Sequence, residues 1–328
     1  MARKGMKAMA LALAAGGLSA SGAASEPALL TEPVQGASLS SEIAPQILDL
    51  EYERFRRLTV PVTIDGQGPF RFMIDTGAQA TVLSRALADR LGLVERRTAL
   101  LVGIASSAPV ETVHLRALSL GRRTQAVPQV PLVEGEHIGD ADGILGIDML
   151  QDQRVLLDFS DRRITLADLE PQTTDRFEII VRAHERLGQL IVSRALVDGI
   201  RTTVLIDTGA QGSIGNPALE RRLRRLPSQG KASMTDVHGQ VLTGEAKIAG
   251  QLQLGNALLR NFPIAFADSP TFHMLGLSDR PALILGMSEL RLFRRVAIDF
   301  RARRIMLDLP HETALADSWP SPRLRAER

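Results

Sequence analysis

One hexapeptide occurs twice in this chain, and its surroundings are duplicated with it. Residues Ile74–Gln79 and Ile206–Gln211 both read Ile-Asp-Thr-Gly-Ala-Gln, each at the end of an apolar run. The apolar runs predict strands, and the glycine predicts a tight turn after each of them. A carboxylate that follows a buried strand is costly unless it is paired or protonated. Because Asp75 and Asp207 share this setting, we expect them to meet as a pair of carboxyl groups.

A second motif follows each hexapeptide. Asp142–Gly146 reads Asp-Gly-Ile-Leu-Gly, and Ala282–Gly286 reads Ala-Leu-Ile-Leu-Gly. After each motif come an apolar strand, a turn and a second strand, over Arg154–Leu166 and Arg295–Leu307. The motifs keep the same order, and the offset between the two copies is nearly constant. This pattern predicts two homologous units within one chain rather than an array of short repeats.

These paired motifs resemble those of the aspartic proteases, and Asp-Thr-Gly-Ala is most similar to the retroviral-type (retropepsin-like) branch. The resemblance extends from Arg57 to Leu309. It implies a mostly β, bilobal aspartic-protease (acid protease) fold, made of two homologous β-barrel-like lobes with short helices. It also implies that Asp75 and Asp207 are the catalytic pair, that a peptide or protein substrate binds between the lobes, and that no cofactor or metal takes part.

The resemblance assigns supporting roles around the two aspartates. Each threonine hydroxyl is expected to reach the backbone of the opposite loop, and each glycine to leave room for that crossing; plain strand propensity is the alternative for the threonines. The support residues are Thr76, Gly77, Ala78, Thr208, Gly209 and Ala210. The hydrophobic-hydrophobic-glycine elements, expected to thread beside the catalytic loops as psi-loops, are Ile144, Leu145, Gly146, Ile284, Leu285 and Gly286.

Two hairpins are candidates for flaps that fold over a substrate. They are predicted at Leu100–Ser107 and Met234–Val241, and ordinary surface hairpins are the alternative. A glycine lets the tip bend and approach a peptide backbone. Apolar residues in the first flap favour hydrophobic side chains beside the cleaved bond. The substrate-facing residues predicted here are Leu101, Val102, Gly103, Ile104, His238 and Gly239.

The chemistry that the resemblance implies depends on proton sharing. Two carboxyl groups about 3 Å apart cannot both ionise, so one of them keeps a proton. The ionised group activates water, and the protonated group polarises the peptide carbonyl. Ala78 and Ala210 place no hydroxyl where pepsin-like enzymes hydrogen-bond the carboxylates. Because such bonds lower a pKa, we expect activity at mildly acidic to near-neutral pH.

Other reaction classes lack their sequence marks. The chain of 328 residues has no cysteine, which excludes disulfides, thiol nucleophiles and thiolate metal sites. Its six histidines show no close metal-ligand spacing, and no GxSxG, GxGxxG or P-loop motif is present. Asp142 and Asp148 are expected in turns and caps, whereas Glu289 has no assigned role.

Charge does not favour a nucleic-acid partner. The net charge is only +2. One predicted helix carries a run of arginines, but leucines at helical spacing between them predict that the arginines lie on a solvated face. These arginines are Arg221, Arg222, Arg224 and Arg225. We therefore expect no nucleic acid, no stable membrane insertion and no metal among the partners.

The two ends of the chain are predicted to lie outside the lobes. Met1–Ala24 has a basic start, an apolar run and small residues near Ala23, which predicts a cleaved signal peptide and export to the periplasm or medium. An uncleaved membrane anchor is the alternative, although the run is short for it. The expected domains are a flexible N-terminal segment at 25–50, an N-terminal lobe at 51–170, a C-terminal lobe at 171–309 and a disordered tail at 310–328.

We predict from these features an aspartic endopeptidase that is active as a monomer. It would hydrolyse peptide bonds with water activated between Asp75 and Asp207, without a covalent intermediate. The alternative is a non-catalytic peptide-binding or scaffold protein that retains the fold, which the two intact Asp-Thr-Gly triplets disfavour. Dimerisation to complete the site is unnecessary, because one chain supplies both triplets.

Overall fold

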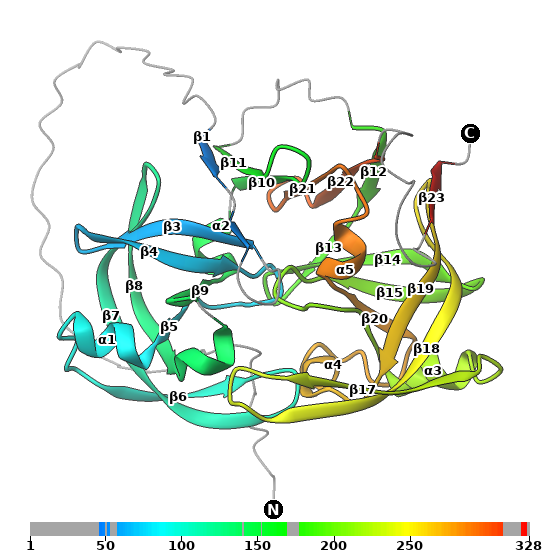
Figure 1. The fold of residues 1–328 in the computed structure, drawn as a ribbon, viewed down its shortest axis with the longest axis horizontal. Coiled ribbons are helices and arrows are strands. Elements are labelled where there is room, and N and C mark those ends of the chain that lie inside the picture. Colours follow the sequence, from blue (N-terminus) through cyan, green and yellow to red (C-terminus); the bar gives the residue numbers. More distant parts are fainter. Residues whose placement is uncertain are drawn as a thin grey trace, which may run out of the picture.

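The computed structural model describes residues 46–49, 51–52, 58–139, 141–151, 153–168, 177–310 and 323–326. Their regular structure is mostly β, in three sheets (Figure 1). Two large sheets form two lobes that lie side by side, and the third sheet lies across one end of both lobes. The predicted two-lobed, mostly β fold is confirmed.

The first lobe is an eight-stranded sheet in the order β2-β3-β4-β9-β5-β8-β7-β6. Along β3, Val60, Val62 and Ile64 are buried, because alternate side chains of a strand point to the same face. The strands are β2 (Glu51–Tyr52), β3 (Leu58–Ile64), β4 (Gln67–Ile74), β5 (Val82–Ser84), β6 (Arg97–Val102), β7 (Ser107–Leu120), β8 (Arg123–Val133) and β9 (Gly143–Leu145).

The second lobe repeats this arrangement in a nine-stranded sheet, β13-β14-β15-β20-β16-β19-β18-β17, with β23 also paired to β19. In both lobes the strand that precedes the aspartate runs parallel to the strand of the second motif, β4 with β9 and β15 with β20. The strands are β13 (His184–Arg186), β14 (Gln189–Val197), β15 (Ile200–Ile206), β16 (Ile214–Gly215), β17 (Ser228–Thr235), β18 (Val241–Leu254), β19 (Ala257–Phe266), β20 (Ala282–Leu285) and β23 (Arg323–Ala326).

The third sheet is shared by the two halves of the chain. Its six strands have the order β1-β11-β10-β21-β22-β12. They are β1 (Gln46–Asp49), β10 (Gln153–Asp158), β11 (Arg163–Asp168), β12 (Ile179–Arg182), β21 (Arg295–Asp299) and β22 (Arg304–Asp308). Val155 of β10 lies opposite Ile298 of β21, and Arg154 forms an ion pair of 3.3 Å with the buried Asp299. The strand-turn-strand units predicted after each second motif are therefore present, but they join into one sheet.

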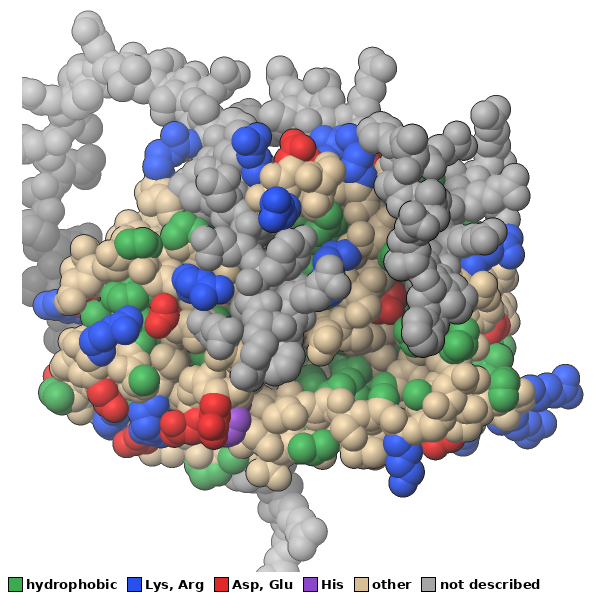
Figure 2. Space-filling model, viewed as in Figure 1, with side chains coloured by type: hydrophobic (Ala, Val, Ile, Leu, Met, Phe, Trp, Pro, Cys, Tyr) green, Lys and Arg blue, Asp and Glu red, His purple; other side chains and the backbone are tan. Residues whose placement is uncertain are grey.

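Short helices connect the strands. They are α1 (Arg85–Arg90), the 3-10 helix η1 (Gly135–Ile138), α2 (Ile147–Leu150), α3 (Pro217–Arg222), α4 (Pro270–Met274) and α5 (Met287–Leu290). Asn216 caps α3, and Pro217 occupies its first turn. Leu219 and Leu223 are buried and the four arginines are exposed, as predicted, but α3 ends at Arg222, so that Arg224 and Arg225 lie in the turn after it. On the face shown in Figure 2, basic and acidic side chains are both scattered.

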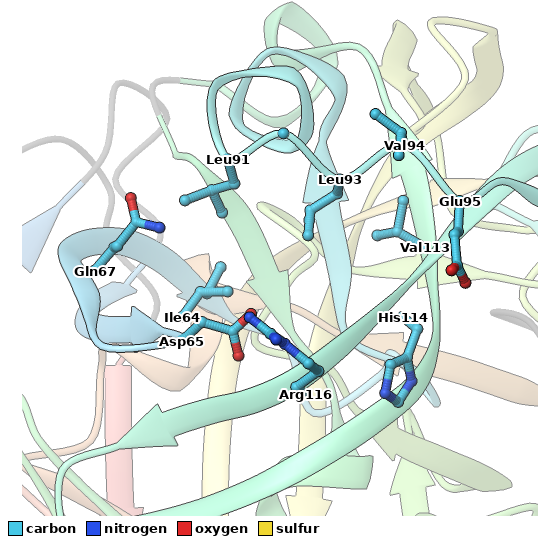
Figure 3. A pocket seen from close by; sticks show the side chains of 11 residues that line it. Ile64, Asp65, Gln67, Leu91, Leu93, Val94, Glu95, Val113, His114 and Arg116 are labelled. Carbon is cyan, nitrogen blue, oxygen red and sulfur yellow. The ribbon is translucent and has the colours of Figure 1, made fainter.

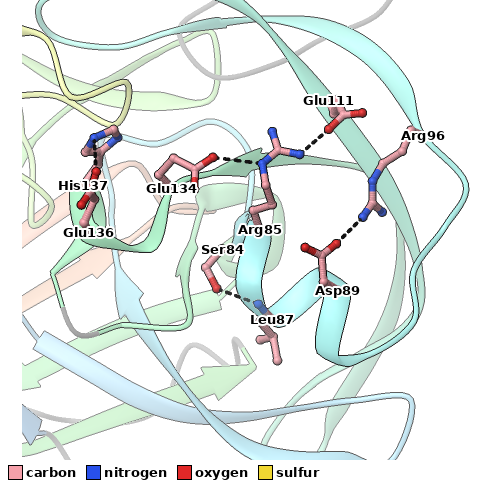
Figure 4. A network of polar contacts seen from close by, with 9 residues as sticks. All are labelled: Ser84, Arg85, Leu87, Asp89, Arg96, Glu111, Glu134, Glu136 and His137. Atoms are coloured by element: carbon pink, nitrogen blue, oxygen red, sulfur yellow. Dashed lines mark hydrogen bonds and ion pairs between the residues drawn. The ribbon is translucent and has the colours of Figure 1, made fainter.

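Polar contacts fasten α1 to the first lobe (Figure 4). The Ser84 hydroxyl accepts a hydrogen bond of 3.2 Å from the Leu87 N–H, so that it caps the helix. Arg85 forms ion pairs with Glu111 of β7 and with Glu134 at the end of β8. Because these side chains are largely solvated, each pair stabilises the fold by about 1 kcal/mol at most.

One large hydrophobic core runs through both lobes and the shared sheet. Its buried members include Phe72 of β4, Leu157 of β10, Phe262 of β19 and Ile298 of β21. Two smaller clusters, one in each lobe, pack on the other side of β4 and β15, the strands that precede Asp75 and Asp207. The lobes are therefore joined by packing as well as by strand pairing, and this makes a fixed relative position of the two aspartates possible.

The predicted signal peptide at Met1–Ala24 lies outside the described residues, as do most of residues 25–50 and 310–328. Of the residues described in these segments, Gln46–Asp49 pairs with β11 and Arg323–Ala326 pairs with β19. In the part of the chain that the structure describes, no helix is long and apolar enough to cross a membrane.

Candidate active site

Asp75 and Asp207 stand directly after two matching strands, β4 and β15. The Asp75 N–H donates to the Leu145 carbonyl of β9 at 3.0 Å, and the Asp207 N–H donates to the Leu285 carbonyl of β20 at 3.0 Å. These bonds continue the parallel pairing by one residue past each strand. The second motif of each lobe therefore holds the backbone of its aspartate.

The glycines of the second motif are required by close backbone contact. A Cβ atom on Gly146 would lie 2.5 Å from the Ala80 carbonyl carbon, and one on Gly286 would lie 2.5 Å from the Gly212 oxygen. The next residues donate N–H groups back to the aspartate loops, Ile147 to Ala78 and Met287 to Ala210, at 2.8 and 2.9 Å. Each predicted psi-loop element thus lies beside the aspartate loop of its own lobe.

The two threonines cross between the lobes. The Thr76 hydroxyl donates to the Ile206 carbonyl at 3.0 Å and accepts from the Thr208 N–H at 3.2 Å. In return, the Thr208 hydroxyl donates to the Ile74 carbonyl at 2.8 Å and accepts from the Thr76 N–H at 3.0 Å. Both threonines are buried. This reciprocal network sets the distance between the two aspartate loops.

Each aspartate carboxyl is also held by its own loop. The Asp75 Oδ1 accepts from the N–H groups two and three residues later, at 2.8 and 2.9 Å. The Asp207 Oδ1 accepts from the corresponding groups at 2.8 and 3.0 Å. The donors are Gly77, Ala78, Gly209 and Ala210. Since Oδ1 is used in both loops, Oδ2 is the oxygen that remains for the opposite lobe.

The two carboxyl groups meet over these glycines. A Cβ atom on Gly77 would lie 2.5 Å from the Asp207 Oδ2, and a Cβ atom on Gly209 would overlap the Asp75 Oδ2. A hydrogen bond between the Asp75 and Asp207 carboxyl groups is one of the causes that raise the pKa of Asp75. A hydrogen bond between two carboxyl oxygens requires a proton on one of them.

The electrostatics favour this proton. Burial raises the pKa of Asp75 well above its usual 3.8, and the negative charge of Asp207 raises it further. The hydrogen bonds from Gly77 and Ala78 act in the opposite direction. Because the two acids interact strongly, they titrate as one unit.

A small cavity of about 80 Å³ lies over the pair and is lined by both carboxyl groups. The predicted flap hairpins are present, between β6 and β7 and between β17 and β18, and both contribute to its lining. The lining residues from the first flap are Val102, Gly103 and Ile104, and those from the second include Asp236 and Val237. His137 of η1 completes one side.

The flap tips contact each other directly. The Ser106 hydroxyl donates to the Asp236 Oδ2 at 2.6 Å, and the His238 Nε2 lies 3.1 Å from the Leu101 carbonyl oxygen. The Ser269 hydroxyl donates to the Ile104 carbonyl at 2.6 Å. Together these contacts close the two flaps over the pair of carboxyl groups.

Three predicted flap residues differ from their expected position. Leu101 is buried in a core cluster of the first lobe, because its strand turns that side chain inward. His238 reaches the backbone of the other flap, and Gly239 lies against the ring of His137. None of these three residues is among the cavity lining.

The sequence did not single out several residues that hold the loops. The Gln189 side chain, fully buried, donates to the Gly77 carbonyl, and the Gln79 side chain donates to the Leu187 carbonyl at 2.6 Å. The β13–β14 hairpin of the second lobe thus supports the first aspartate loop. The repetition of the hexapeptide is a sequence signal for Gln79, whereas no motif contains Gln189.

A larger cavity of about 360 Å³ lies elsewhere in the first lobe (Figure 3). Its polar residues include Asp65 and Arg116, which form an ion pair of 3.2 Å, and its floor is apolar. It contains no pair of facing carboxyl groups among the described residues. In those residues, likewise, no group of three or more acidic or histidine side chains is placed to hold a metal ion.

The Aspartyl protease family matches two blocks of the sequence, residues 60–149 and 193–288, which together exceed half of the chain. The chain belongs to the aspartyl protease family. One matched block lies in each lobe, and each contains one aspartate of the pair and one glycine of the second motif. Membership supports a protease that acts on a peptide or protein substrate. No curated protein matches the sequence.

Proposed function

We propose that this aspartyl protease is an endopeptidase in which Asp75 and Asp207 activate water for peptide hydrolysis. The observation that carries the proposal is the meeting of the two carboxyl groups, one from each lobe: the Asp207 carboxyl lies against Gly77, the Asp75 carboxyl lies against Gly209, and both line one cavity. One chain supplies both groups, so the active form is a monomer. The reaction needs no cofactor and forms no covalent intermediate.

The reaction proceeds through one shared proton. The ionised carboxyl takes a proton from water as the water oxygen attacks the peptide carbonyl carbon, while the protonated carboxyl donates its proton to the carbonyl oxygen. The tetrahedral diol then collapses as the C–N bond breaks. The carboxyl that took the water proton gives it to the amine nitrogen, and the other carboxyl, now ionised, takes a proton from one hydroxyl of the diol, so that the pair again holds one proton. Because the acids titrate together, neither has a fixed role.

The supporting residues have distinct tasks in this proposal. Thr76 and Thr208 maintain the separation of the two loops, and the backbone donors from Gly77 to Ala78 and from Gly209 to Ala210 orient the carboxyl groups. A misplacement of about 1 Å at such a site can cost roughly 100-fold in rate.

The flaps are proposed to open for the substrate. Small-molecule pockets usually have volumes of about 300–1,000 Å³, so a cavity of about 80 Å³ is too small for a peptide. Substrate binding must therefore separate the contact of Ser106 with Asp236. On closing, Val102, Gly103 and Ile104 would cover the peptide, and the apolar side chains of Val102 and Ile104 favour hydrophobic residues beside the cleaved bond.

The raised pKa of Asp75 sets the expected pH range. The pair is active while it holds one proton, and the elevated pKa keeps this proton at a higher pH than an ordinary aspartate would. Activity should therefore extend to mildly acidic and near-neutral pH, and decline as the pH rises further and the pair loses the proton. The proposed signal peptide would place this activity outside the cytoplasm.

A cleavage assay tests the proposal. The purified protein without residues 1–24 is incubated with a diverse peptide library from pH 3 to 9, with and without pepstatin, and products are identified by mass spectrometry. We expect internal cleavage that pepstatin inhibits, with the maximum above pH 3. Binding of peptides without cleavage at any pH would favour a non-catalytic scaffold. Gel filtration of the active fraction distinguishes a monomer from a dimer.

A further inference from the structure

Glu289 is a buried acid that the proposed reaction does not use. It lies in α5, directly after the second psi-loop, and its side chain is 1% exposed. The Ser213 hydroxyl donates a hydrogen bond to its Oε2 and accepts one of 3.2 Å from the Gly286 N–H. The hydroxyl thus joins the end of the Asp207 loop to the psi-loop, and Glu289 fixes the orientation of that hydroxyl.

The first lobe contains the same bridge. The Thr81 hydroxyl, six residues after Asp75 as Ser213 is after Asp207, donates to the Asp148 Oδ1 at 2.8 Å. It also accepts a hydrogen bond of 3.3 Å from the Gly146 N–H. Because two lobes with different side chains keep the same connection, it serves the catalytic loop rather than one local packing arrangement.

The two acids differ in how well an ionised form is solvated. Asp148 is partly exposed and accepts hydrogen bonds from the N–H groups of Thr81 and Met149 in addition to the hydroxyl. Burial raises the pKa of Asp148 as well, and these donors lower it in part, because they stabilise a carboxylate. Glu289 is more deeply buried, and Ser213 is its side-chain donor. A buried carboxylate with so few donors is costly, and a neutral carboxylic acid is not.

The charges around Glu289 do not remove its preference for the neutral form. Burial raises the pKa of Glu289 to about 7, and the hydrogen bonds from Ser213 and from the backbone N–H of Glu289 itself, together with the positive charge of Arg291, lower it only in part. Arg291 follows α5, and its Nε donates to the Met287 carbonyl. Among the described charged side chains, Arg291 is the one whose charge acts on Glu289.

We propose that Glu289 is a positioning residue that holds the Asp207 loop in its catalytic geometry through Ser213, and that it does so as a neutral carboxylic acid. The catalytic part of this inference rests on the proposed function. α5 also holds the loop through two backbone bonds, Met287 to Ala210 and Ser288 to Gln211, both of 2.9 Å. Ionisation of Glu289 places an unsolvated charge beneath this segment and loosens it.

Two variants distinguish a positioning role of the Glu289 side chain from a role in filling space. Glu289→Gln keeps the shape and the oxygen that accepts from Ser213 and carries no charge, whereas Glu289→Ala removes the contact. At pH 5 we expect Glu289→Ala to lower kcat at least tenfold with KM within twofold, and Glu289→Gln to keep kcat within about threefold of wild type. The positioning role is overturned by any one of three results. These are a kcat that falls in neither variant, a kcat that falls equally in both, and an effect on KM alone.

Whether Glu289 is neutral can be tested without a cleavage assay. Since the folded pKa is above the ordinary value of 4.5, the contribution of Glu289 to stability is full below about pH 4.5 and is lost as the pH rises to about 7. From pH 5 to 8, the urea midpoint of wild type should therefore fall relative to that of Glu289→Gln. In the same interval, amide protection of residues 209–213 should fall in wild type and not in Glu289→Gln.

A matched variant in the first lobe completes the design. Between pH 5 and 8, the urea midpoint of Asp148→Asn should change by the same amount as that of wild type. A constant difference in midpoint between wild type and Glu289→Gln, together with unchanged protection of residues 209–213, overturns the inference. If wild type cleaves no peptide, the proposed function fails, while the pH-dependent stability and amide protection still decide whether neutral Glu289 holds the loop.

Discussion

The two halves of the molecule build the same aspartate loop within different surroundings. In each half the aspartate N–H binds the psi-loop carbonyl, Oδ1 accepts two backbone hydrogen bonds, and the threonine crosses to the other lobe. Beyond these contacts the halves diverge. Asp148 and Thr81 support the first loop, Glu289 and Ser213 the second, and a glutamine from β14 reaches only the first.

This comparison distinguishes the contacts that must be the same in both lobes from those that can vary. The contacts within and between the two loops determine the distance between the carboxyl groups, and they are the same in both lobes. The support beneath each loop needs only an acceptor for a buried hydroxyl, so either acid can provide it. Variants in the loops should therefore have equal effects in the two halves, whereas variants in the surroundings should not.

The largest expected effect comes from the aspartates. Asp75→Asn and Asp207→Asn should each lower kcat by roughly 10²–10⁴-fold, because each removes one member of the acid–base pair. The two losses should be similar, since the pair acts as a unit. The exposed Asp161→Asn serves as a control and should retain activity. Substantial cleavage by either catalytic variant would show that the pair is not the catalyst.

Next in size are the glycines beneath the carboxyl groups. Gly77→Ala and Gly209→Ala each insert a methyl group against the aspartate of the opposite lobe and should lower kcat by about 100-fold. Gly212→Ala is a matched control in the second loop, because a Cβ atom there meets no atom within 4 Å. Wild-type kcat in Gly77→Ala, measured with a folded protein, would refute the close approach of the carboxyl groups.

The crossing threonines should show a smaller and reciprocal effect. Thr76→Val and Thr208→Val each leave buried backbone groups of the opposite loop without a partner, which costs about 1–3 kcal/mol of unfolding free energy. Because the side chains share one network, the double variant should lose less than the sum. Urea denaturation measures this, with the exposed Thr98→Val as control. Strict additivity would mean that the two threonines do not act together.

The smallest expected effect concerns the flaps. Ser106→Ala removes the hydrogen bond to Asp236 and should weaken flap closure by about 0.5–1.5 kcal/mol. Amide exchange at the two flap tips should accelerate up to about tenfold. The neighbouring exposed Ser107→Ala is the control and should leave exchange unchanged. Equal exchange in both variants would exclude this contact as a latch between the flaps.

Much of the fold could be predicted because its signals are local. The repeated hexapeptide, the second motifs and the hairpin turns each occupy a few consecutive residues, and the alternation along Leu58–Ile64 marks a half-buried strand. Ser84 and Asn216, residue types that favour the start of a helix, cap α1 and α3. These features depend on residues that are close in the sequence, so a single sequence is sufficient to predict them.

The rest depends on contacts between distant residues. Nothing in the alternation of β10 indicates that it pairs with β21 rather than within its own lobe. The inward side chain of Leu101 follows from the register of β6 on β7, which its sequence does not determine. Glu289 reads as a helix residue, and its burial beside Ser213 becomes visible only when the second lobe is assembled.

The most direct measurement is the titration of the paired carboxyl groups, followed by carbon-13 NMR and assigned with the two Asp→Asn variants. We predict that the Asp75 carboxyl titrates well above the usual value of about 3.9, and that its pKa falls in Asp207→Asn, because the neighbouring negative charge is removed while burial remains. Independent titration of Asp75 and Asp207, each near the ordinary value and each unaffected by the other, would contradict a shared proton between the lobes.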